Sequence, residues 1–136
     1  MDRTLFDRAN LDHLKKALTV YARRQRVTSE NIANVETRGY QAQEYRFEDM
    51  LRRAQGNHLQ GLSTSEGHLP VGRRGIADTD GEIRGQDTGF DNGVNDVNID
   101  SEMTDLATTE LSYRLATRVL SMKYSLLRSA VAGRVR

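Results

Sequence analysis

The sequence predicts a mainly α-helical protein in which two long terminal helices pair as a coiled-coil-like hairpin. Three observations support this prediction. Apolar residues recur at helical spacing through the first 40 residues, a second helical pattern fills residues 101–136, and nine of the eleven glycines and the only proline lie between them, in residues 54–100. We therefore expect an N-terminal helix with its closing turn over 1–40, an irregular glycine-rich segment over 41–99 and a C-terminal helix over 100–136, the first and last parts forming one helical domain.

The N-terminal helix is predicted by residues spaced alternately three and four apart. These are Leu11, Leu14, Leu18, Tyr21, Gln25, Thr28, Ile32 and Val35. The spacing places a single seam along one side of a helix, and it fits a coiled coil and an ordinary amphipathic helix equally well. We expect the helix to end between Asn34 and Gly39, where poor helix formers precede a glycine that tolerates left-handed backbone.

The middle of the chain begins with a mixed stretch from Tyr40 to Arg53 and continues into the glycine-rich region. Frequent glycines and turn-prone pairs such as Asn92 and Gly93 exclude a long helix there. The short runs 69–71 and 81–84 are candidates for a small β-hairpin. The rest of this segment is expected to be irregular.

The C-terminal helix is expected to begin at Asp100 or Ser101, either of which could cap its free amides. It carries two apolar stripes that are nearly opposite each other around the helix. The first stripe is Leu106, Tyr113, Leu120, Tyr124, Leu127 and Val131, and the second is Leu111, Leu115, Val119, Met122, Leu126 and Ala130. The N-terminal seam is sufficient to cover one stripe, so the other is expected to pack against a different molecule.

Composition argues against a catalytic, metal-binding or nucleic-acid-binding protein. Twenty basic residues balance 19 acidic ones, which is unlike the strong positive charge of a nucleic-acid binder. Cysteine is absent, the three histidines lack the spacing of a zinc motif, and the acidic residues around Asp80 lack the spacing of a calcium loop. We predict no catalytic residue, no metal, no cofactor and no small-molecule substrate. The chain also lacks an apolar run long enough for a membrane span or a secretory signal peptide.

Two classes of function agree with these features. One is a structural subunit that assembles with further copies through the uncovered stripe, and the other is a helical adaptor that binds one partner at fixed stoichiometry.

The end of the N-terminal helix resembles the signature of the bacterial flagellar rod and hook family. In that family the pattern runs approximately as Asn, Ile or Leu, Ala, Asn, two variable residues, Thr, Pro, Gly and Tyr. The chain matches it at Asn31, Ile32, Ala33, Asn34, Thr37, Gly39 and Tyr40. It departs at Arg38, where the family usually has proline. The stretch from Asn98 to Met103, which leads into Leu111, Tyr113 and Leu120, is similar to the start and body of the family's C-terminal helix.

The short length of the chain, without a large domain between the helices, makes it similar to the proximal rod proteins of that family. The resemblance implies a non-enzymatic subunit of the periplasmic rod, exported by the flagellar type III pathway without a cleaved signal peptide. The implied neighbours are FliE and the export gate on one side, and FlgC, FlgF or further copies of the chain on the other. Among the proximal rod proteins, FlgC is the nearest alternative that the resemblance allows.

The resemblance also implies roles for individual side chains. Subunit packing is expected to involve the N-terminal seam and both stripes of the C-terminal helix, at Leu11, Leu14, Leu18, Tyr21, Leu106, Leu111, Tyr113, Leu115, Val119, Leu120, Met122, Leu126 and Leu127. Phe47 and Leu51 resemble the aromatic-plus-aliphatic signal by which early flagellar subunits engage the export gate, although a packed turn also explains this pair.

Overall fold

Two long helices and a small antiparallel sheet make up the described part of the chain. A computed structural model describes residues 8–56 and 79–133. The elements follow in the order α1 (Arg8–Ala33), β1 (Gln43–Arg46), α2 (Glu48–Gly56), β2 (Glu82–Gly85) and α3 (Ile99–Val131). The prediction of a mainly helical protein with two long terminal helices is therefore confirmed. No helix in the described ranges is both long and apolar enough to cross a lipid bilayer.

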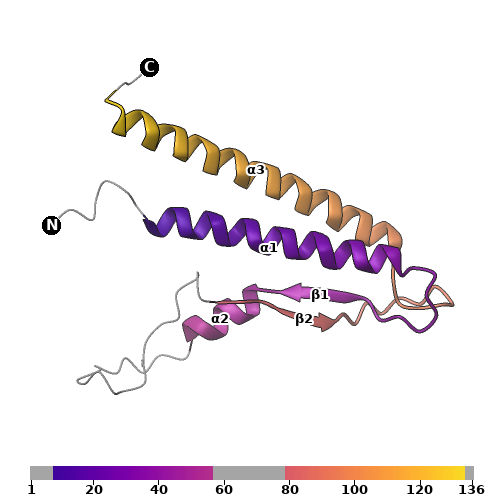
Figure 1. The fold of residues 1–136 in the computed structure, drawn as a ribbon. Helices are drawn as coiled ribbons and strands as arrows, with labels where there is room; N and C mark the ends of the chain where they lie inside the picture. The colour runs from indigo at the N-terminus through magenta and orange to yellow at the C-terminus, as the bar shows by residue number, and fades with distance from the viewer. Residues whose placement is uncertain (1–7, 57–78, 134–136) are drawn as a thin grey trace.

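Helices α1 and α3 lie side by side and run in opposite directions, as Figure 1 shows. They are closest where α1 ends and α3 begins, and they diverge toward the start of α1 and the end of α3. All eight positions of the N-terminal seam are half-buried. On α3 the half-buried positions include Leu106, Thr109, Ala116, Leu120 and Leu127.

The small sheet and α2 cover a second face of α1. Strands β1 and β2 pair in antiparallel register, with Tyr45 opposite Ile83. Tyr45 and Phe47 pack with Val20 and Val27 of α1 in a buried apolar cluster, against which Leu51 of α2 also packs. Val20 and Val27 lie about a third of a turn around α1 from the seam. Helix α1 is thus held between α3 on one side and the hairpin on the other.

Three local expectations differ from the structure. The expected strand at 81–84 is observed as β2, one residue later at Glu82–Gly85, and it pairs with β1; residues 69–71 lie outside the described ranges. Helix α2 lies in what was expected to be an irregular segment, where Glu48 and Asp49 near its start and Arg53 near its end favour a short helix. Helix α3 begins earlier than expected: Asn98 is its cap, and its side chain accepts hydrogen bonds from the backbone amides of Asp100 and Ser101.

Candidate assembly surface and the motif junction

The side chain of Asn31 joins α1, β1 and α3 at one point. It is 1% exposed and makes four hydrogen bonds. Its Nδ2 donates to the Gln43 carbonyl at 2.8 Å and to Oε1 of Glu102 at 3.0 Å. Its Oδ1 accepts from the Gln43 amide and from the Tyr40 hydroxyl, both at 3.0 Å. The amide of Asn31 therefore pairs with the backbone of Gln43 as a neighbouring strand would, and all its donors and acceptors are satisfied.

Glu102 contributes a buried carboxyl group to this junction from the first turn of α3. The residue is only 6% exposed. Burial raises the pKa of the Glu102 carboxyl above its usual range, whereas the hydrogen bond from Asn31 acts in the opposite direction. Burial also raises the pKa of the Tyr40 hydroxyl, and the nearby carboxylates of Glu30 and Glu102 add to the effect. The junction thus holds α3 to α1 through a desolvated acid.

The loop between β2 and α3 closes the end of α1. Nδ2 of Asn95 lies within 3.0 Å of the carbonyl oxygens of Asn34, Val35 and Thr37, which follow the last turn of the helix. The Asn34 and Thr37 carbonyls also accept from the backbone amides of Thr37 and Tyr40, so Asn95 adds a further donor to the turn that follows α1. The Gly39 amide donates to the Val94 carbonyl at 3.1 Å. The segment that precedes α3 is therefore bound to the turn that follows α1.

Gly39 allows the chain to reverse after α1. Its φ of 72° lies in the left-handed region, which favours glycine. Within the turn, Asn34 Nδ2 donates to the Glu30 carbonyl at 2.7 Å, and the Thr37 hydroxyl donates to Asn34 Oδ1 at 3.2 Å. Arg38 is exposed in this turn, where the family pattern has proline. The reversal depends on Gly39 and on side-chain hydrogen bonds.

A second set of polar contacts fastens the hairpin to α1. The Tyr45 hydroxyl accepts from Arg23 at 3.1 Å and from the Gly81 amide at 2.9 Å. Asp80 pairs with Lys16 at 2.8 Å and with Arg23 at 3.3 Å. The hydrogen bond and positive charge of Lys16, together with the charge of Arg23, lower the pKa of the Asp80 carboxyl. The chain therefore returns to α1 at a fixed point before β2 begins.

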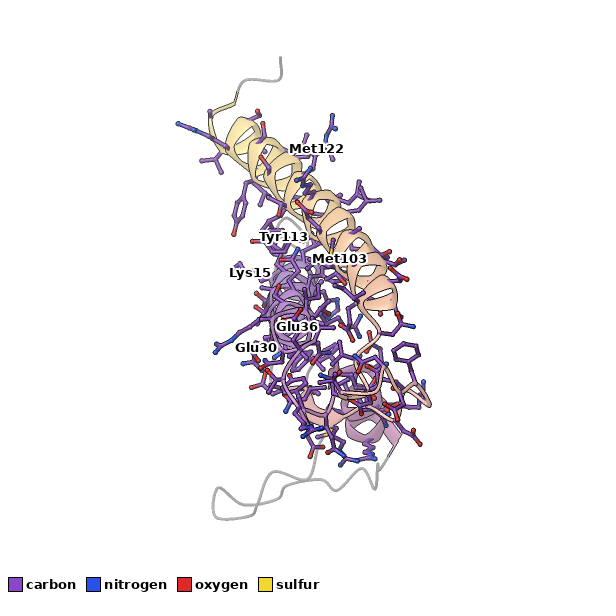
Figure 2. The ribbon with its side chains drawn as sticks, turned by 90° about the vertical axis from the view of Figure 1, so that its right-hand side faces the viewer. Lys15, Glu30, Glu36, Met103, Tyr113 and Met122 are labelled. Carbon is purple, nitrogen blue, oxygen red and sulfur yellow. The ribbon has the colours of Figure 1, made fainter. Side chains whose placement is uncertain are left out.

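The second stripe of α3 is exposed along its length. The exposed fractions of its five large residues range from 37% to 70%, and these residues are Leu111, Leu115, Val119, Met122 and Leu126. Ala130 is exposed as well. In Figure 2 the half of α3 that carries Met122 stands clear of the rest of the molecule. This continuous apolar surface is not covered by the described part of the chain.

The first stripe lies closer to α1 and is covered unevenly. Leu106, Leu120 and Leu127 are half-buried, whereas Tyr113, Tyr124 and Val131 are exposed. Val131, at the far end of this stripe, is 76% exposed.

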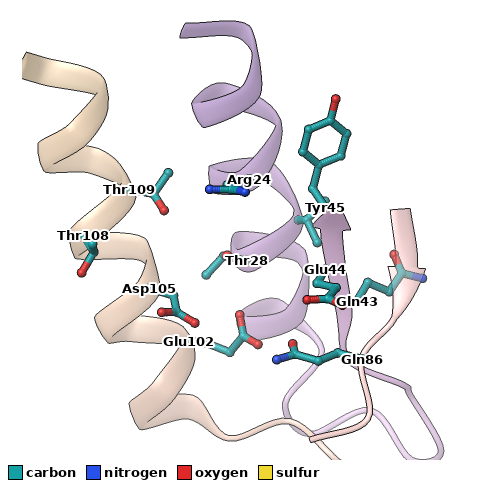
Figure 3. Close-up of a pocket in the computed structure, with 11 residues that line it drawn as sticks. Arg24, Thr28, Gln43, Glu44, Tyr45, Gln86, Glu102, Asp105, Thr108 and Thr109 are labelled. Carbon is teal, nitrogen blue, oxygen red and sulfur yellow. The ribbon is translucent and has the colours of Figure 1, made fainter. Parts of the chain in front are cut away.

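A polar cleft of about 310 Å³ lies between α1, β1 and the first half of α3. Its walls include Arg24 and Thr28 from α1, Glu44 from β1, and Glu102 and Asp105 from α3. Figure 3 shows Glu102 and Asp105 directed from α3 toward the space in front of α1 and β1. Within the described ranges, no group of three or more His, Cys, Asp or Glu residues is arranged to hold a metal ion. The cleft is acidic on its α3 side.

Comparison with known proteins places the chain in a family. A family model described as flagella basal body rod protein matches residues 11–41. The flagellar basal body rod protein FlgB of Yersinia enterocolitica is 34% identical over 112 residues, which cover 78% of this chain and 81% of that protein. FlgB of Aeromonas hydrophila is 32% identical over 133 residues, covering 94% and 96%, and FlgB of Bacillus subtilis is 27% identical over 126 residues, covering 90% and 93%. The chain belongs to the FlgB family of flagellar basal body rod proteins.

As a member of the FlgB family, the chain is a structural subunit of the proximal rod of the flagellar basal body. The family is one of structural proteins and not of enzymes. The region that the family model matches contains α1, its closing turn and the residues up to Gln41, so it includes Asn31 and Gly39.

The structure also places Phe47 and Leu51, the two residues of the candidate export signal. Phe47 is buried in the apolar cluster and Leu51 packs against it, so both contribute to the fold of the monomer. A role in export concerns the unfolded chain, and it stays a prediction.

Sequence reasoning missed the residues that bind the loop to α1. Asn92, Asn95 and Asn98 recur every three residues, and the side-chain oxygen of each accepts from the backbone amide two positions later. Of the three, Asn95 also reaches the turn after α1 through its Nδ2. This spacing is the signal that could have revealed them, since asparagine commonly bonds to backbone two or three residues away. The burial of Val20 and Val27 was not predicted, because the spacing of three and four marks only a single seam on α1.

Proposed function

We propose that this FlgB family member builds the rod by packing the exposed stripe of α3 against neighbouring subunits. The observation that carries the proposal is the continuous exposure of the stripe from Leu111 to Leu126. Complete burial of one large aliphatic side chain contributes about 1.5 to 3 kcal/mol. Because the five large residues are already partly shielded, covering them contributes on the order of 5 kcal/mol. A surface of this kind favours stable association over a solitary existence.

In this proposal α1 and α3 supercoil as a coiled-coil hairpin once neighbouring subunits hold α3 in place. The half-buried seam on α1, with its spacing of three and four, supports this arrangement. The neighbours are further copies of the chain, the rod subunits FlgC and FlgF, and FliE and the export gate at the base of the rod. The chain reaches the periplasm through the flagellar type III pathway, with Phe47 and Leu51 engaging the gate before they fold into the core.

Export through a narrow channel favours a monomer of low stability that gains order on assembly. We expect the second half of α3 to fray in the dilute monomer. High and cooperative helicity of the dilute monomer in far-ultraviolet circular dichroism would count against this part of the proposal.

The proposal is tested in a flagellated bacterium whose own copy of the gene is replaced by variants. Leu115→Asp should abolish motility and remove the protein from isolated basal bodies, because a charge in the packed stripe cannot be solvated. Ser121→Asp is the matched control, since Ser121 is also exposed on α3 but lies outside the stripe. A photo-crosslinker at Ser112, beside Leu115, should link the chain to rod subunits in basal bodies.

The alternative of a helical adaptor predicts a different result. An adaptor would crosslink to one partner only, at a fixed and small ratio, and never to a second copy of itself. Full motility of the Leu115→Asp variant would contradict both functions.

A further inference from the structure

The acidic cleft beside α3 has one carboxylate oxygen that lacks a partner. Oε1 of the buried Glu102 accepts a hydrogen bond from Asn31, whereas Oε2 has no hydrogen-bond donor within the described ranges. Asp105, one turn further along α3, forms no ion pair with another described residue. Glu44, on the opposite wall, already pairs with Arg46. Two acidic groups on α3 therefore face the cleft, and no described residue forms an ion pair with either of them. Arg24, which also lines the cleft, pairs with Glu48 instead.

The charges of α3 are divided along its length. Its acidic residues are Asp100, Glu102, Asp105 and Glu110, and its basic residues are Arg114, Arg118, Lys123 and Arg128. Glu110 and Arg114 pair with each other. The remaining acidic residues all lie in the first two turns, and the remaining basic residues all lie in the second half. A stagger between neighbouring helices brings these two regions together.

Arg118 is the cation best placed for such a contact. It follows Leu115 by three residues and precedes Met122 by four, so it borders the exposed stripe. It is exposed and forms no ion pair with another described residue. Arg128 is also exposed, but it is turned about 80° further from the stripe.

We propose that Arg118 of one copy enters the acidic cleft of the next copy and pairs there with Asp105 and Glu102. This inference rests on the proposed function, because it requires that copies of the chain pack against one another in the rod. The two α3 helices then lie parallel with a stagger of about 20 to 24 Å, which is the axial rise from Asp105 or Glu102 to Arg118.

The cleft suits a guanidinium group. Its volume of about 310 Å³ admits an arginine side chain, and its walls offer the hydroxyl oxygens of Thr28, Thr108 and Thr109 besides the carboxylates. Arginine presents five N–H donors in a planar fork, so it can bond a carboxylate and a hydroxyl together. A cation also offsets the cost of keeping Glu102 charged out of water.

The same geometry explains why the contact repeats. Asp105 and Arg118 lie about 140° apart around α3, so a single pair of copies cannot use both surfaces in one interface. Each copy offers its cleft to one neighbour and its Arg118 to another. A heterologous contact of this kind does not close on itself and leads to an extended assembly.

Charge reversal tests the pairing in the full chain, expressed in place of the host's own copy. Arg118→Glu and Asp105→Arg should each reduce the copies found in isolated basal bodies at least tenfold, and combining them should restore most of the loss. Arg128→Glu is the matched control and should incorporate normally. Circular dichroism of each purified variant checks that helicity is unchanged. If the combined variant incorporates no better than either single variant, the pairing is wrong.

Cysteine crosslinking tests the stagger independently, because the chain has no cysteine of its own. Thr109→Cys combined with Met122→Cys places each thiol four residues after Asp105 and Arg118, so this pair has the same stagger and the same separation around the helix as the proposed contact. Within one chain these positions are about 20 Å apart, beyond the reach of a disulfide. Oxidation of isolated basal bodies should give a ladder of crosslinked copies.

Thr109→Cys with Tyr124→Cys is the matched control, since Tyr124 is also exposed but lies about 160° around α3 from Met122 and should give no ladder. Incorporation of the Thr109 and Met122 variant without a ladder would overturn the stagger but leave the proposed function intact. Failure of the unmodified chain to enter basal bodies would instead overturn the proposed function.

Discussion

Replacement of Asn31 by alanine is the sharpest test of the junction between α1, β1 and α3. The substitution removes four hydrogen bonds and leaves a desolvated carboxyl group on Glu102. A neutral hydrogen bond contributes about 0.5 to 1.5 kcal/mol net, and one to a charged group about 1.5 to 3 kcal/mol. The half-buried Tyr40 can turn toward water and so loses little. The two bonds to Gln43 and the one to Glu102 give an expected loss of about 3 kcal/mol in the free energy of unfolding.

The loss is measured by urea unfolding followed by circular dichroism. Because the monomer is expected to be weakly stable, trimethylamine oxide is added at constant concentration to strengthen the folded baseline. For a slope of about 1.5 kcal/mol per molar urea, the midpoint should fall by about 2 M. The slope itself should stay unchanged, since the same surface is exposed on unfolding.

Two further variants of α1 make the result specific. Ser29→Ala, at an exposed position of the same helix, should leave the midpoint within experimental error. Asn31→Asp keeps the acceptor oxygen but places a second carboxylate beside Glu102, so its stability should recover on acidification. A loss below about 1 kcal/mol for Asn31→Ala would refute the claim that this amide holds the three elements together.

Three other perturbations act at separate points of the fold. Gly81→Ala should destabilise the hairpin by about 1 to 3 kcal/mol, because its Cβ would lie 2.4 Å from the buried Tyr45 ring, and a lower urea midpoint would show this. Because the Glu102 pKa is raised in the folded state, the unmodified chain should lose stability as pH rises from the ordinary glutamate pKa through the raised one. Glu102→Gln should remove this decline, which unfolding at several pH values measures. Asp80→Asn should lower stability by at most about 1 kcal/mol, because the ion pairs of Asp80 with Lys16 and Arg23 are exposed to solvent. The loss should appear only above the ordinary aspartate pKa, and it should be smaller at high salt, which screens these pairs. Thermal midpoints at low and high salt measure that difference.

The long helices were predictable because each repeats a local signal many times. The seam that begins at Leu11 and the stripes that begin at Leu106 and Leu111 each extend over several turns, so errors at single positions do not alter the outcome. Gly39 was predictable because few residues other than glycine adopt a positive φ.

The junction was not predictable, because its contacts join residues far apart in the sequence. Asn31 bonds to Glu102, which lies 71 positions later, and β1 pairs with a strand that begins at Glu82. Asparagine is usually a surface or turn residue, and nothing in the local sequence marks Asn31 as buried. The pairing of β2 with β1 was not predicted either, because the two strands lie almost 40 positions apart in the chain, whereas the expected partner at 69–71 lies outside the described residues.

The two parts of the molecule have opposite requirements for partners. At the junction, the side chains of Asn31 and Asn95 bond to partners from the same chain, so the junction keeps its shape without a neighbouring subunit. The second half of α3 has apolar residues such as Leu126 that find no cover within the described ranges. Local stability should therefore be high at the junction and low in α3 beyond Leu111. Substitutions at the junction should reduce the amount of folded monomer, whereas substitutions along the exposed stripe of α3 should reduce assembly and leave the junction folded.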